Sequence, residues 1–431
     1  MAKNTSKNLR NQVMYQIFVR NFSKEGTFRA VIPRLDSIKK LGVDIVWFAP
    51  IHPIGETARK GTLGSPYAIR DYREVNPEYG TINDFKATVD AIHKAGMKCM
   101  IDVVYNHTSP DSVLAATHPE WFYHKPDGSF GNRVGDWTDI IDLDYANEDL
   151  WDYQIDTLKM WAKIVDGFRC DVAPLVPLDF WKKARTEVEK VRTDCIWLSE
   201  SIDPQFILTM RDLGLIAQSD CEMYQAFDIL YDYDIYQALT EYVSGTGSLK
   251  AYSDAINRQE YTYPDNYVKL RFLENHDQPR ARFLFPGEKA LRNATAFLYF
   301  QKGMTLVYAG QEMGISHLPS LFDRDTVEWE SPEAIDLTGL MQKLYRIKQD
   351  TLFTDSTYRT KTYEDNVLKA IYSRGDKKVI GIFSLKGEPG IIPINVSDGR
   401  YENLIDGSTI EIMHGYVSLT GEPIIIRADK K

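Results

Sequence analysis

The sequence predicts an α/β protein: a (β/α)8 TIM barrel with a small inserted subdomain after strand 3 and a C-terminal antiparallel β-sandwich domain. Three observations lead to this prediction. Between residues 13 and 350, eight short apolar runs alternate with segments of helical period, as in a parallel sheet covered by helices. Residues 107–147 show little helical period and much Gly, Pro and aromatic residue. Beyond residue 350, apolar and polar residues alternate as they do in antiparallel strands.

The eight apolar runs are the predicted barrel strands. They are residues 13–19, 43–50, 98–105, 167–171, 196–199, 223–227, 268–273 and 305–308. The run 43–50 is too uniformly apolar to have one wet face, so it belongs in a covered parallel sheet. Helices are expected around residues 28–38, 85–92, 150–164, 178–191, 287–302 and 333–349. Eight units favour closure into a barrel, with an open doubly wound sheet as the alternative.

Four segments follow from this pattern. They are a first part of the barrel (1–106), the inserted subdomain (107–147), a second part of the barrel (148–350) and the C-terminal β-domain (351–431). In the β-domain, strands are expected at 367–373, 378–385, 390–396 and 424–427, separated by turns that contain Gly.

Composition excludes several classes of partner. The 431-residue chain has a net charge of −10, which argues against nucleic acid or an anionic membrane surface. No glycine-rich phosphate loop follows a predicted strand, so nucleotide binding has no support. The four cysteines stand alone near strand-like runs and are expected to be buried free thiols. The start of the chain lacks an apolar signal core, and no run approaches the roughly 20 apolar residues of a membrane span. We therefore expect a soluble, cytoplasmic protein.

The predicted strands end in groups that can do chemistry. In a barrel of this kind, reacting side chains stand at the carboxyl ends of the strands. Arg169 and Asp171 are two residues apart on one strand and so project from the same face. The groups placed at strand ends are Asp102, Asn106, His107, Arg169, Asp171, Glu200, His276, Asp277 and Arg280. Because buried charges are costly unless paired or used, their convergence on one rim indicates a functional site.

Four of these strand ends resemble the short signatures of the α-amylase family of retaining glycoside hydrolases. The matching segments are 102–107, 167–171, Glu200 after an apolar strand, and 275–277, in the order that the family shows. Segments 42–50, 64–67, 71–72 and 310–312 are also similar to that family. The resemblance spans residues 13 to about 350, and a terminal β-domain is typical of the family as well.

The resemblance implies a separate catalytic role for each of three acids. Asp171 would be the nucleophile, Glu200 the general acid/base, and Asp277 a group that hydrogen-bonds sugar hydroxyls and favours the transition state. A retaining enzyme needs the first two carboxyls roughly 5 Å apart across the scissile bond. Arg169 would keep Asp171 ionised, and apolar neighbours would raise the pKa of Glu200.

The resemblance also implies substrate-binding residues. His107 and His276 would donate hydrogen bonds to the cleaved sugar, and Tyr67 would stack on it. Arg169, Asp102 and Arg280 complete the predicted binding set, with Asp102 in a supporting role that orients Arg169 or a loop.

The sequence departs from many α-amylases just beyond the nucleophile. A Lys-His pair that contacts the leaving sugars and helps to hold calcium is replaced here by Pro174 and Leu175. Asn106 matches a calcium ligand, but its usual partners are not evident in the short insert. No cofactor is therefore expected to be required, and a metal would be held only if Asn106 finds partners.

The expected function is hydrolysis of α-glucosidic bonds, mainly α-1,4, in malto-oligosaccharides through a covalent glycosyl-enzyme intermediate. Segments 171–172 and 275–280 also look like the oligo-1,6-glucosidase, sucrose-isomerase and neopullulanase branches. An α-1,6-acting glucosidase, or a transglycosylase that converts sucrose, maltose or glucans with the same residues, therefore stays open. A sugar-binding relative without activity is disfavoured, since all three acids are present. The oligosaccharide is the one partner predicted, and the sequence does not indicate an oligomeric state.

Overall fold

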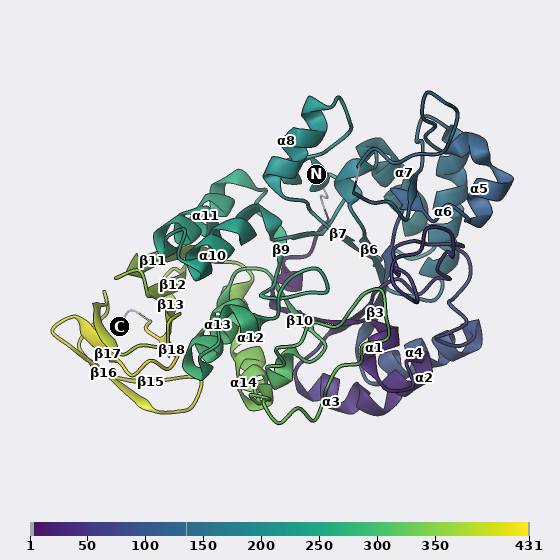
Figure 1. The fold of residues 1–431 in the computed structure, drawn as a ribbon. Coiled ribbons are helices and arrows are strands. Elements are labelled where there is room, and N and C mark those ends of the chain that lie inside the picture. The colour runs from purple at the N-terminus through teal and green to yellow at the C-terminus, as the bar shows by residue number, and fades with distance from the viewer. Residues whose placement is uncertain (1–3, 135, 430–431) are drawn as a thin grey trace.

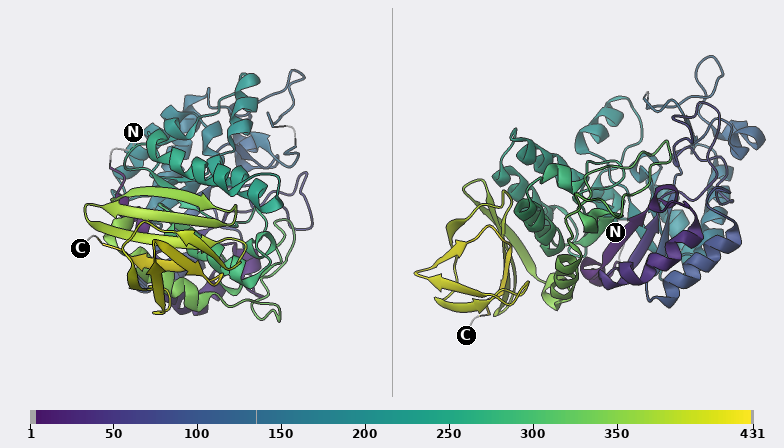
Figure 2. Two further views of the ribbon diagram at one scale, coloured as in Figure 1. Left: turned by 90° about the vertical axis from the view of Figure 1, so that its left-hand side faces the viewer. Right: turned by 60° about the horizontal axis from the view of Figure 1, so that its bottom comes forward.

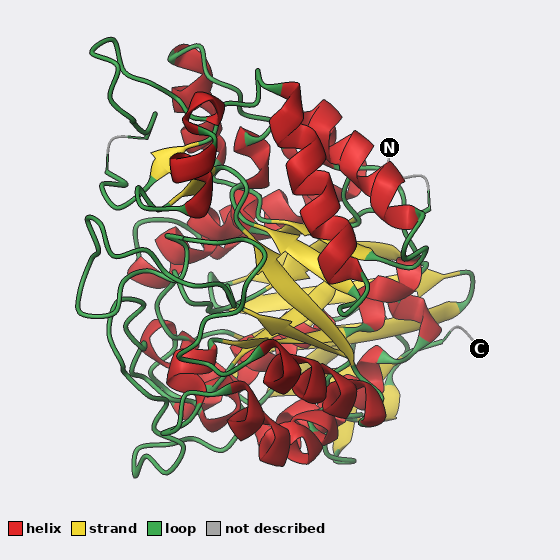
Figure 3. Cartoon of the chain, turned by 90° about the vertical axis from the view of Figure 1, so that its right-hand side faces the viewer, coloured by secondary structure: helices red, strands yellow, loops and turns green. Residues whose placement is uncertain are grey.

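A closed barrel of eight parallel strands forms the centre of the molecule in the computed structural model (Figures 1 and 3). The structure describes residues 4–134 and 136–429, so the predicted lack of a signal segment lies partly outside it. The strand order around the barrel is β1-β10-β9-β8-β7-β6-β3-β2. The strands are β1 (Val13–Ile17), β2 (Ile45–Phe48), β3 (Lys98–Val103), β6 (Gly167–Cys170), β7 (Ile196–Ser199), β8 (Ile229–Tyr231), β9 (Val268–Arg271) and β10 (Met304–Tyr308). The predicted barrel is thereby confirmed.

The sixth strand was predicted in the wrong place. Residues 223–227 form the end of a short helix, α9 (Asp220–Met223), and the turn after it, and the strand β8 begins only at Ile229. Ser219 and Glu222 form a reciprocal capping box that starts α9. Such a box satisfies free N–H groups of the first turn, so the apolar residues that follow become part of a helix end and its turn.

Helices surround the barrel on its outer face (Figure 3). The principal ones are α3 (Leu35–Lys40), α4 (Ile82–Lys94), α6 (Glu148–Ala162), α7 (Leu178–Glu189), α10 (Tyr233–Ser244), α11 (Leu249–Thr262), α13 (Glu288–Phe300) and α14 (Thr338–Lys348). Shorter helices are α1 (Val19–Phe22), α2 (Phe28–Val31), α5 (Val113–Thr117), α8 (Pro204–Asp212) and α12 (Ala281–Leu284). In α4, Phe85, Val89 and Ile92 lie on one buried face at helical spacing.

The parallel register brings the chemical groups to one rim. Asp102 of β3 pairs with Arg169 of β6, and Cys170 of β6 pairs with Ser199 of β7. Asp171 and Glu200 directly follow β6 and β7, so the two residues lie side by side at the carboxyl end of the barrel. Topology alone thus places the two acids as neighbours.

The segment after β3 folds into a small two-stranded subdomain. Strands β4 (His107–Thr108) and β5 (Ile141–Asp142) pair in antiparallel fashion, and α5 and the 3-10 turn η3 (Pro119–Trp121) lie between them. His107 pairs with Asp142 across these strands. The subdomain therefore holds His107 close to the barrel rim.

The C-terminal domain contains two four-stranded antiparallel sheets that face each other (Figure 2). One sheet has the order β11-β12-β13-β18 and the other β14-β17-β16-β15. Their strands are β11 (Thr357–Tyr363), β12 (Val367–Arg374), β13 (Lys377–Ser384), β14 (Gly390–Pro393), β15 (Gly399–Glu402), β16 (Thr409–Met413), β17 (Tyr416–Leu419) and β18 (Ile424–Arg427). The predicted sandwich is confirmed, with four strands that the sequence pattern did not show.

The structure bears on two further predictions, the burial of the cysteines and the lack of a membrane-spanning segment. Cys99, Cys170 and Cys195 are buried free thiols, whereas Cys221 is a free thiol that is exposed. Cys221 was wrongly predicted to be buried, because it lies on the short helix α9 and not in a strand. Among the described residues, no helix combines the length and apolar character needed to cross a membrane.

Candidate active site

A single guanidinium binds three carboxyl groups at the centre of the rim. Arg169 NH1 donates to Asp102 Oδ1 at 2.9 Å and to Asp171 Oδ1 at 2.6 Å. Its NH2 lies 2.8 Å from Glu200 Oε1 as an ion pair. The Arg169 and Asp102 side chains have no exposed surface, while Asp171 and Glu200 keep 9% and 10% exposed. Asp102 is therefore placed to orient Arg169 from behind, and the other two acids reach the surface.

Burial and incomplete neutralisation set the acidity of this cluster. Burial raises the pKa of Glu200 to about 8, that of Asp102 to about 7 and that of Asp171 to about 6, each opposed by the Arg169 charge. One cation cannot neutralise three desolvated carboxylates, so at neutral pH the cluster keeps protons. Asp171 is the most acidic of the three and Glu200 the least. That order gives one ionised carboxylate beside one protonated carboxylic acid.

The residue after Asp171 adopts an unusual backbone conformation. Val172 has φ 34° and ψ 40°, in the left-handed region that β-branched residues rarely adopt. In this conformation its N–H donates to Glu200 Oε2 at 2.7 Å. Strained backbone of this kind is found at functional sites, where the surroundings hold it. Here it fixes the second oxygen of Glu200, and no sequence signal predicted it.

His276 joins the cluster through a short hydrogen-bonded chain. Gln16 Nε2 donates to His276 Nδ1 at 2.7 Å, so the histidine proton sits on Nε2. Nε2 lies 2.5 Å from Tyr67 Oη, and Tyr67 Oη donates to Asp102 Oδ2 at 3.2 Å. The Tyr67 and His276 rings are stacked with their centroids 5.2 Å apart. Burial lowers the pKa of His276 to about 4, so the ring is a neutral donor at neutral pH.

Asp277 and His107 are two further predicted site residues. The Asp277 side chain is 40% exposed, and its Oδ2 lies 3.0 Å from His276 Nε2. His107 is buried, with its ring centroid 5.6 Å from that of Trp137. Burial lowers the pKa of His107 to about 4, which leaves it neutral as well. Both histidines can therefore donate hydrogen bonds without carrying charge.

A cavity of about 710 Å³ opens beside Glu200 and Asp277. Its walls include Trp137 from the inserted subdomain, Phe206 of α8 and Tyr236 of α10. Sequence reasoning missed these aromatic residues, because a loop carries Trp137 and the first turns of α8 and α10 carry Phe206 and Tyr236. It also missed Gln16, although this residue lies next to the carboxyl end of β1, where a polar side chain in an apolar strand is a signal. The volume is typical of small-molecule sites.

Arg280 is placed differently from the prediction. It is 1% exposed, and its NH1 donates to Glu274 Oε1 at 2.6 Å and to the Ala309 carbonyl at 3.1 Å. Its Nε donates to the His317 carbonyl at 2.9 Å. These contacts tie the strand-end loops together below the cleft. The contacts of Arg280 are thus with a carboxylate and two carbonyl groups, and its contact with substrate stays a prediction.

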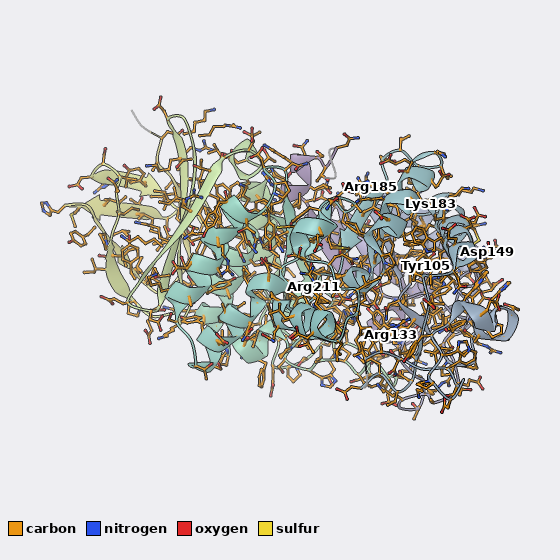
Figure 4. The ribbon with its side chains drawn as sticks, turned by 90° about the horizontal axis from the view of Figure 1, so that it is seen from above. Tyr105, Arg133, Asp149, Lys183, Arg185 and Arg211 are labelled. Carbon is orange, nitrogen blue, oxygen red and sulfur yellow. The ribbon has the colours of Figure 1, made fainter. Side chains whose placement is uncertain are left out.

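The surroundings of Asn106 do not fit a calcium ion. Asn106 Nδ2 contacts His107 Nδ1 at 3.2 Å, and Arg133 NH1 lies 3.7 Å from Asp142 Oδ2. The second Arg133 nitrogen lies 3.9 Å from Asp144 Oδ1, so a guanidinium stands among the carboxylates (Figure 4 labels Arg133). Calcium needs six to eight oxygen ligands. In the described part of the chain, no group of three or more His, Cys, Asp and Glu side chains is arranged for a metal.

Leu175, at the place of the family histidine, faces an apolar cluster. It packs against Ile207 and Met210 of α8, together with Leu215. Leu175 is therefore part of a hydrophobic contact with α8, the helix that carries Phe206.

The closed barrel, with its carboxyl cluster at the carboxyl ends of the strands, defines a (β/α)8-barrel enzyme. The model of the alpha amylase catalytic domain matches residues 8–127 and 117–377, and that of the bacterial alpha amylase C-terminal domain matches residues 359–426. The chain belongs to the α-amylase family.

Known relatives agree with this assignment. A crystal structure of an alpha-amylase from Lactobacillus plantarum is 47% identical, covers 98% of this chain and 100% of its own, and has a TM-score of 0.95. A noncanonic maltogenic alpha-amylase, AmyB from Thermotoga neapolitana, is 33% identical with a TM-score of 0.87, over 98% of this chain and 100% of its own. Alpha-amylase MalA of Haloarcula japonica is 31% identical over 70% of this chain and 44% of its own length. The chain thus spans less than half of that relative.

Proposed function

We propose that this protein is a retaining glycosidase that cleaves α-glucosidic bonds, mainly α-1,4, in malto-oligosaccharides. One observation carries the proposal: Asp171 and Glu200 bind the two terminal nitrogens of one guanidinium, and the pKa of Glu200 lies above that of Asp171. Side-by-side carboxyls that differ in this way suit the roughly 5 Å separation of a retaining pair.

In this proposal the two acids act in sequence. Asp171 attacks the anomeric carbon while Glu200 gives its proton to the leaving oxygen, which breaks the glycosidic bond and forms a glycosyl ester on Asp171. Glu200, now ionised, takes a proton from water, and the hydroxide oxygen displaces Asp171 from the sugar. Arg169 stabilises the carboxylate that is regenerated, and the neutral His276 and His107 hydrogen-bond sugar hydroxyls.

The sugar class is supported by the relatives and by the cleft. The relatives include alpha-amylases and a cyclomaltodextrinase of Bacillus sp., 24% identical over 89% of this chain and 70% of its own length. Aromatic walls at Trp137 and Tyr236 suit the flat faces of glucose rings. We also propose that the enzyme works without calcium, since Arg133 already supplies positive charge to Asp142 and Asp144.

Replacing the nucleophile tests this assignment. Asp171→Asn should lower the hydrolysis rate of maltotriose by a factor of about 10⁴ or more, because the covalent step is lost. The matched control is Asp149→Asn, on the exposed start of α6 (labelled in Figure 4), which should leave the rate unchanged. NMR of the first product should show the α anomer. A β anomer, or undiminished hydrolysis by Asp171→Asn, would sink the proposal.

A second candidate is transfer of the glycosyl group to another sugar. The aromatic cavity beside Glu200 favours it, because Trp137, Phe206 and Tyr236 offer apolar surface where an acceptor sugar could displace water. A related protein is named as an alpha-1,4-glucan:maltose-1-phosphate maltosyltransferase, 34% identical over 43% of this chain and 32% of its own length. Incubation with pure maltose separates the two: glucose alone indicates hydrolysis, and longer or isomeric sugars indicate transfer.

A further inference from the structure

A second cavity, of about 510 Å³, lies in the C-terminal domain between the edge of one sheet and the edge of the other. Strands β11 and β12 form one wall, and Pro393 of β14 with Ile394 and Asn395 forms the other. Three cationic side chains, Arg359, Lys361 and Lys369, line it. None of the lining residues belongs to the catalytic cleft. So much positive charge around one cavity is unexpected in a chain whose net charge is −10.

Lys369 occupies a position that should be apolar. On β12 it lies between Val367 and Ile371, which face the interior of the sandwich and pack in its core. Lys369 is only 6% exposed. Its Nζ donates to Tyr363 Oη at 2.6 Å and to the Pro393 carbonyl at 3.3 Å, and both acceptors are neutral. Lysine is almost never buried without a counter-charge, so this ammonium lacks a partner of opposite sign.

Two more cations share the same face of the sheet. Lys361 stands directly opposite Lys369 in the antiparallel register of β11 and β12, and Arg359 precedes it by two residues. Like charges opposite each other destabilise a sheet. Within residues 4–134 and 136–429, Lys361 and Lys369 make no ion pair with a carboxylate. Arg359 NH1 reaches Glu260 only at 3.9 Å, and that carboxylate already binds Lys302 at 2.9 Å.

Protection of a sheet edge explains only part of this pattern. Charged residues on edge strands prevent pairing with other chains, and β11 is an edge strand. That role would account for Lys361 and Arg359. It does not account for Lys369, because β12 is an inner strand of its sheet and its lysine is buried.

We propose that this cavity binds a ligand that carries a phosphoryl group. A dianionic phosphate would neutralise the positive charge of Lys369 and lower the repulsion between Lys369 and Lys361. The guanidinium fork of Arg359 matches two phosphate oxygens, and lysine ammonium groups bind phosphate as point charges. The cavity also has room for a sugar attached to the phosphate, with Asn395 and Tyr363 as polar contacts. The site is separate from the catalytic acids and does not depend on the proposed hydrolysis.

Calorimetric titration of the full-length protein tests the site at constant ionic strength with inorganic phosphate, glucose 6-phosphate and maltose. We expect saturable binding of the two phosphates and none of maltose at this site. Lys361→Gln and Lys369→Met should each weaken phosphate binding by about tenfold or more, because each removes a charge-assisted hydrogen bond. Lys377→Gln, an exposed lysine of β13 outside the cavity, is the matched control and should bind as the unaltered protein does.

Thermal unfolding adds a readout that needs no ligand. Lys369→Met should unfold at the same temperature or higher, since it removes an unpaired buried charge from an apolar row. If Lys369→Met is instead less stable than the unaltered protein, the phosphate binding of Lys361→Gln alone tests the proposal. The Lys361 side chain is exposed, so its replacement should not disturb the fold. Undiminished phosphate binding by Lys361→Gln would overturn the proposal, as would maltose binding that this substitution abolishes. Glucose 6-phosphate binding tenfold tighter than inorganic phosphate would assign a sugar phosphate, and equal affinity would assign free phosphate.

Discussion

At the scale of single residues, the Arg169 cluster predicts how activity depends on pH. The proposed nucleophile must be ionised and the proposed acid protonated, so kcat/KM should rise as pH passes the Asp171 pKa of about 6 and fall as it passes the Glu200 pKa of about 8. The two limbs belong to the coupled pair and not strictly to either residue. A pH profile of kcat/KM with maltotriose, whose leaving sugar must be protonated, measures both limbs.

Glu200→Gln isolates the alkaline limb. An activated aryl leaving group needs no proton, so Glu200→Gln should still form the glycosyl-enzyme intermediate. The kcat/KM of this variant should no longer fall at high pH. Asp149→Asn should retain the full bell-shaped profile. If the fall near pH 8 persists in Glu200→Gln, another group is the acid, and Asp102, with its pKa raised to about 7, would be the first to examine.

Val172 allows a test of backbone strain at the nucleophile. Its left-handed conformation costs roughly 1–2 kcal/mol in a residue with a Cβ and close to nothing in glycine. Val172→Gly should therefore cost less stability than Val176→Gly, by about 1–2 kcal/mol, since Val176 is buried in ordinary extended backbone. Denaturant unfolding of both variants measures the difference. Equal losses would show that the conformation at Val172 carries no strain.

Residue by residue, the sequence indicated those site groups that a strand end positions. The parallel register of β3, β6 and β7 brings three acids to the Arg169 guanidinium: Asp102, Asp171 and Glu200. Trp137, which the inserted subdomain carries, escaped prediction. Arg280, another residue that follows a strand, donates to Glu274 in the structure. Spacing locates a residue along the chain, and the structure shows which partner its side chain binds.

At the scale of elements, a buried ionic network joins α9, α10 and β9. Lys269 Nζ on β9 contacts Asp220 of α9 and, at 2.8 Å, Asp234 of α10, and its side chain has no exposed surface. The Lys269 charge, opposed by burial, leaves the pKa of Asp234 below its usual value. A carboxyl with a depressed pKa stabilises the fold above its unfolded pKa, and this contribution is lost as pH falls through its folded pKa.

Lys269→Met should therefore destabilise the protein most at neutral pH. Removing the cation leaves the buried carboxyls of Asp220 and Asp234 without a counter-charge, at a cost of about 3–5 kcal/mol. Near pH 4.5, protonation of these carboxyls relieves the repulsion, so the loss in melting temperature should be smaller than at pH 7.5. Lys183→Met, in an exposed pair with Asp152 (Lys183 is labelled in Figure 4), is the control and should change stability by less than about 1 kcal/mol. A loss independent of pH would contradict this account.

Several elements that the sequence analysis missed have a weak or displaced apolar signal. Strand β8 has only three residues, and the apolar residues before it complete a capped helical turn, so the pattern pointed to 223–227. In the C-terminal domain, β11 reads Thr-Tyr-Arg-Thr-Lys-Thr-Tyr and β15 reads Gly-Arg-Tyr-Glu. Such polar strands are formed by their neighbours through tertiary pairing, which overrides local composition.

At the scale of the whole molecule, the barrel and the C-terminal domain share one hydrophobic core. The sheet β11-β12-β13-β18 lies against the barrel helices α11 and α13 (Figures 1 and 2). Phe383 of β13 has no exposed surface, and its ring centroid lies 5.3 Å from that of Phe297 and 5.5 Å from that of Phe300, both on α13. The opposite face of the same sheet packs in a second core, inside the sandwich. The β-domain is therefore continuous with the barrel and is not a tethered appendage.

This shared core predicts that the two domains unfold together. Phe383→Ala should cost about 3–5 kcal/mol through the cavity it leaves between β13 and α13. Scanning calorimetry should show a single transition, shifted to lower temperature, because loss of packing on either side weakens both. Tyr416→Ala, at a side chain that is 52% exposed on β17, should leave the transition in place. An early separate transition in Phe383→Ala, with the main transition unmoved, would instead show that the β-domain unfolds alone and that the barrel is stable without it.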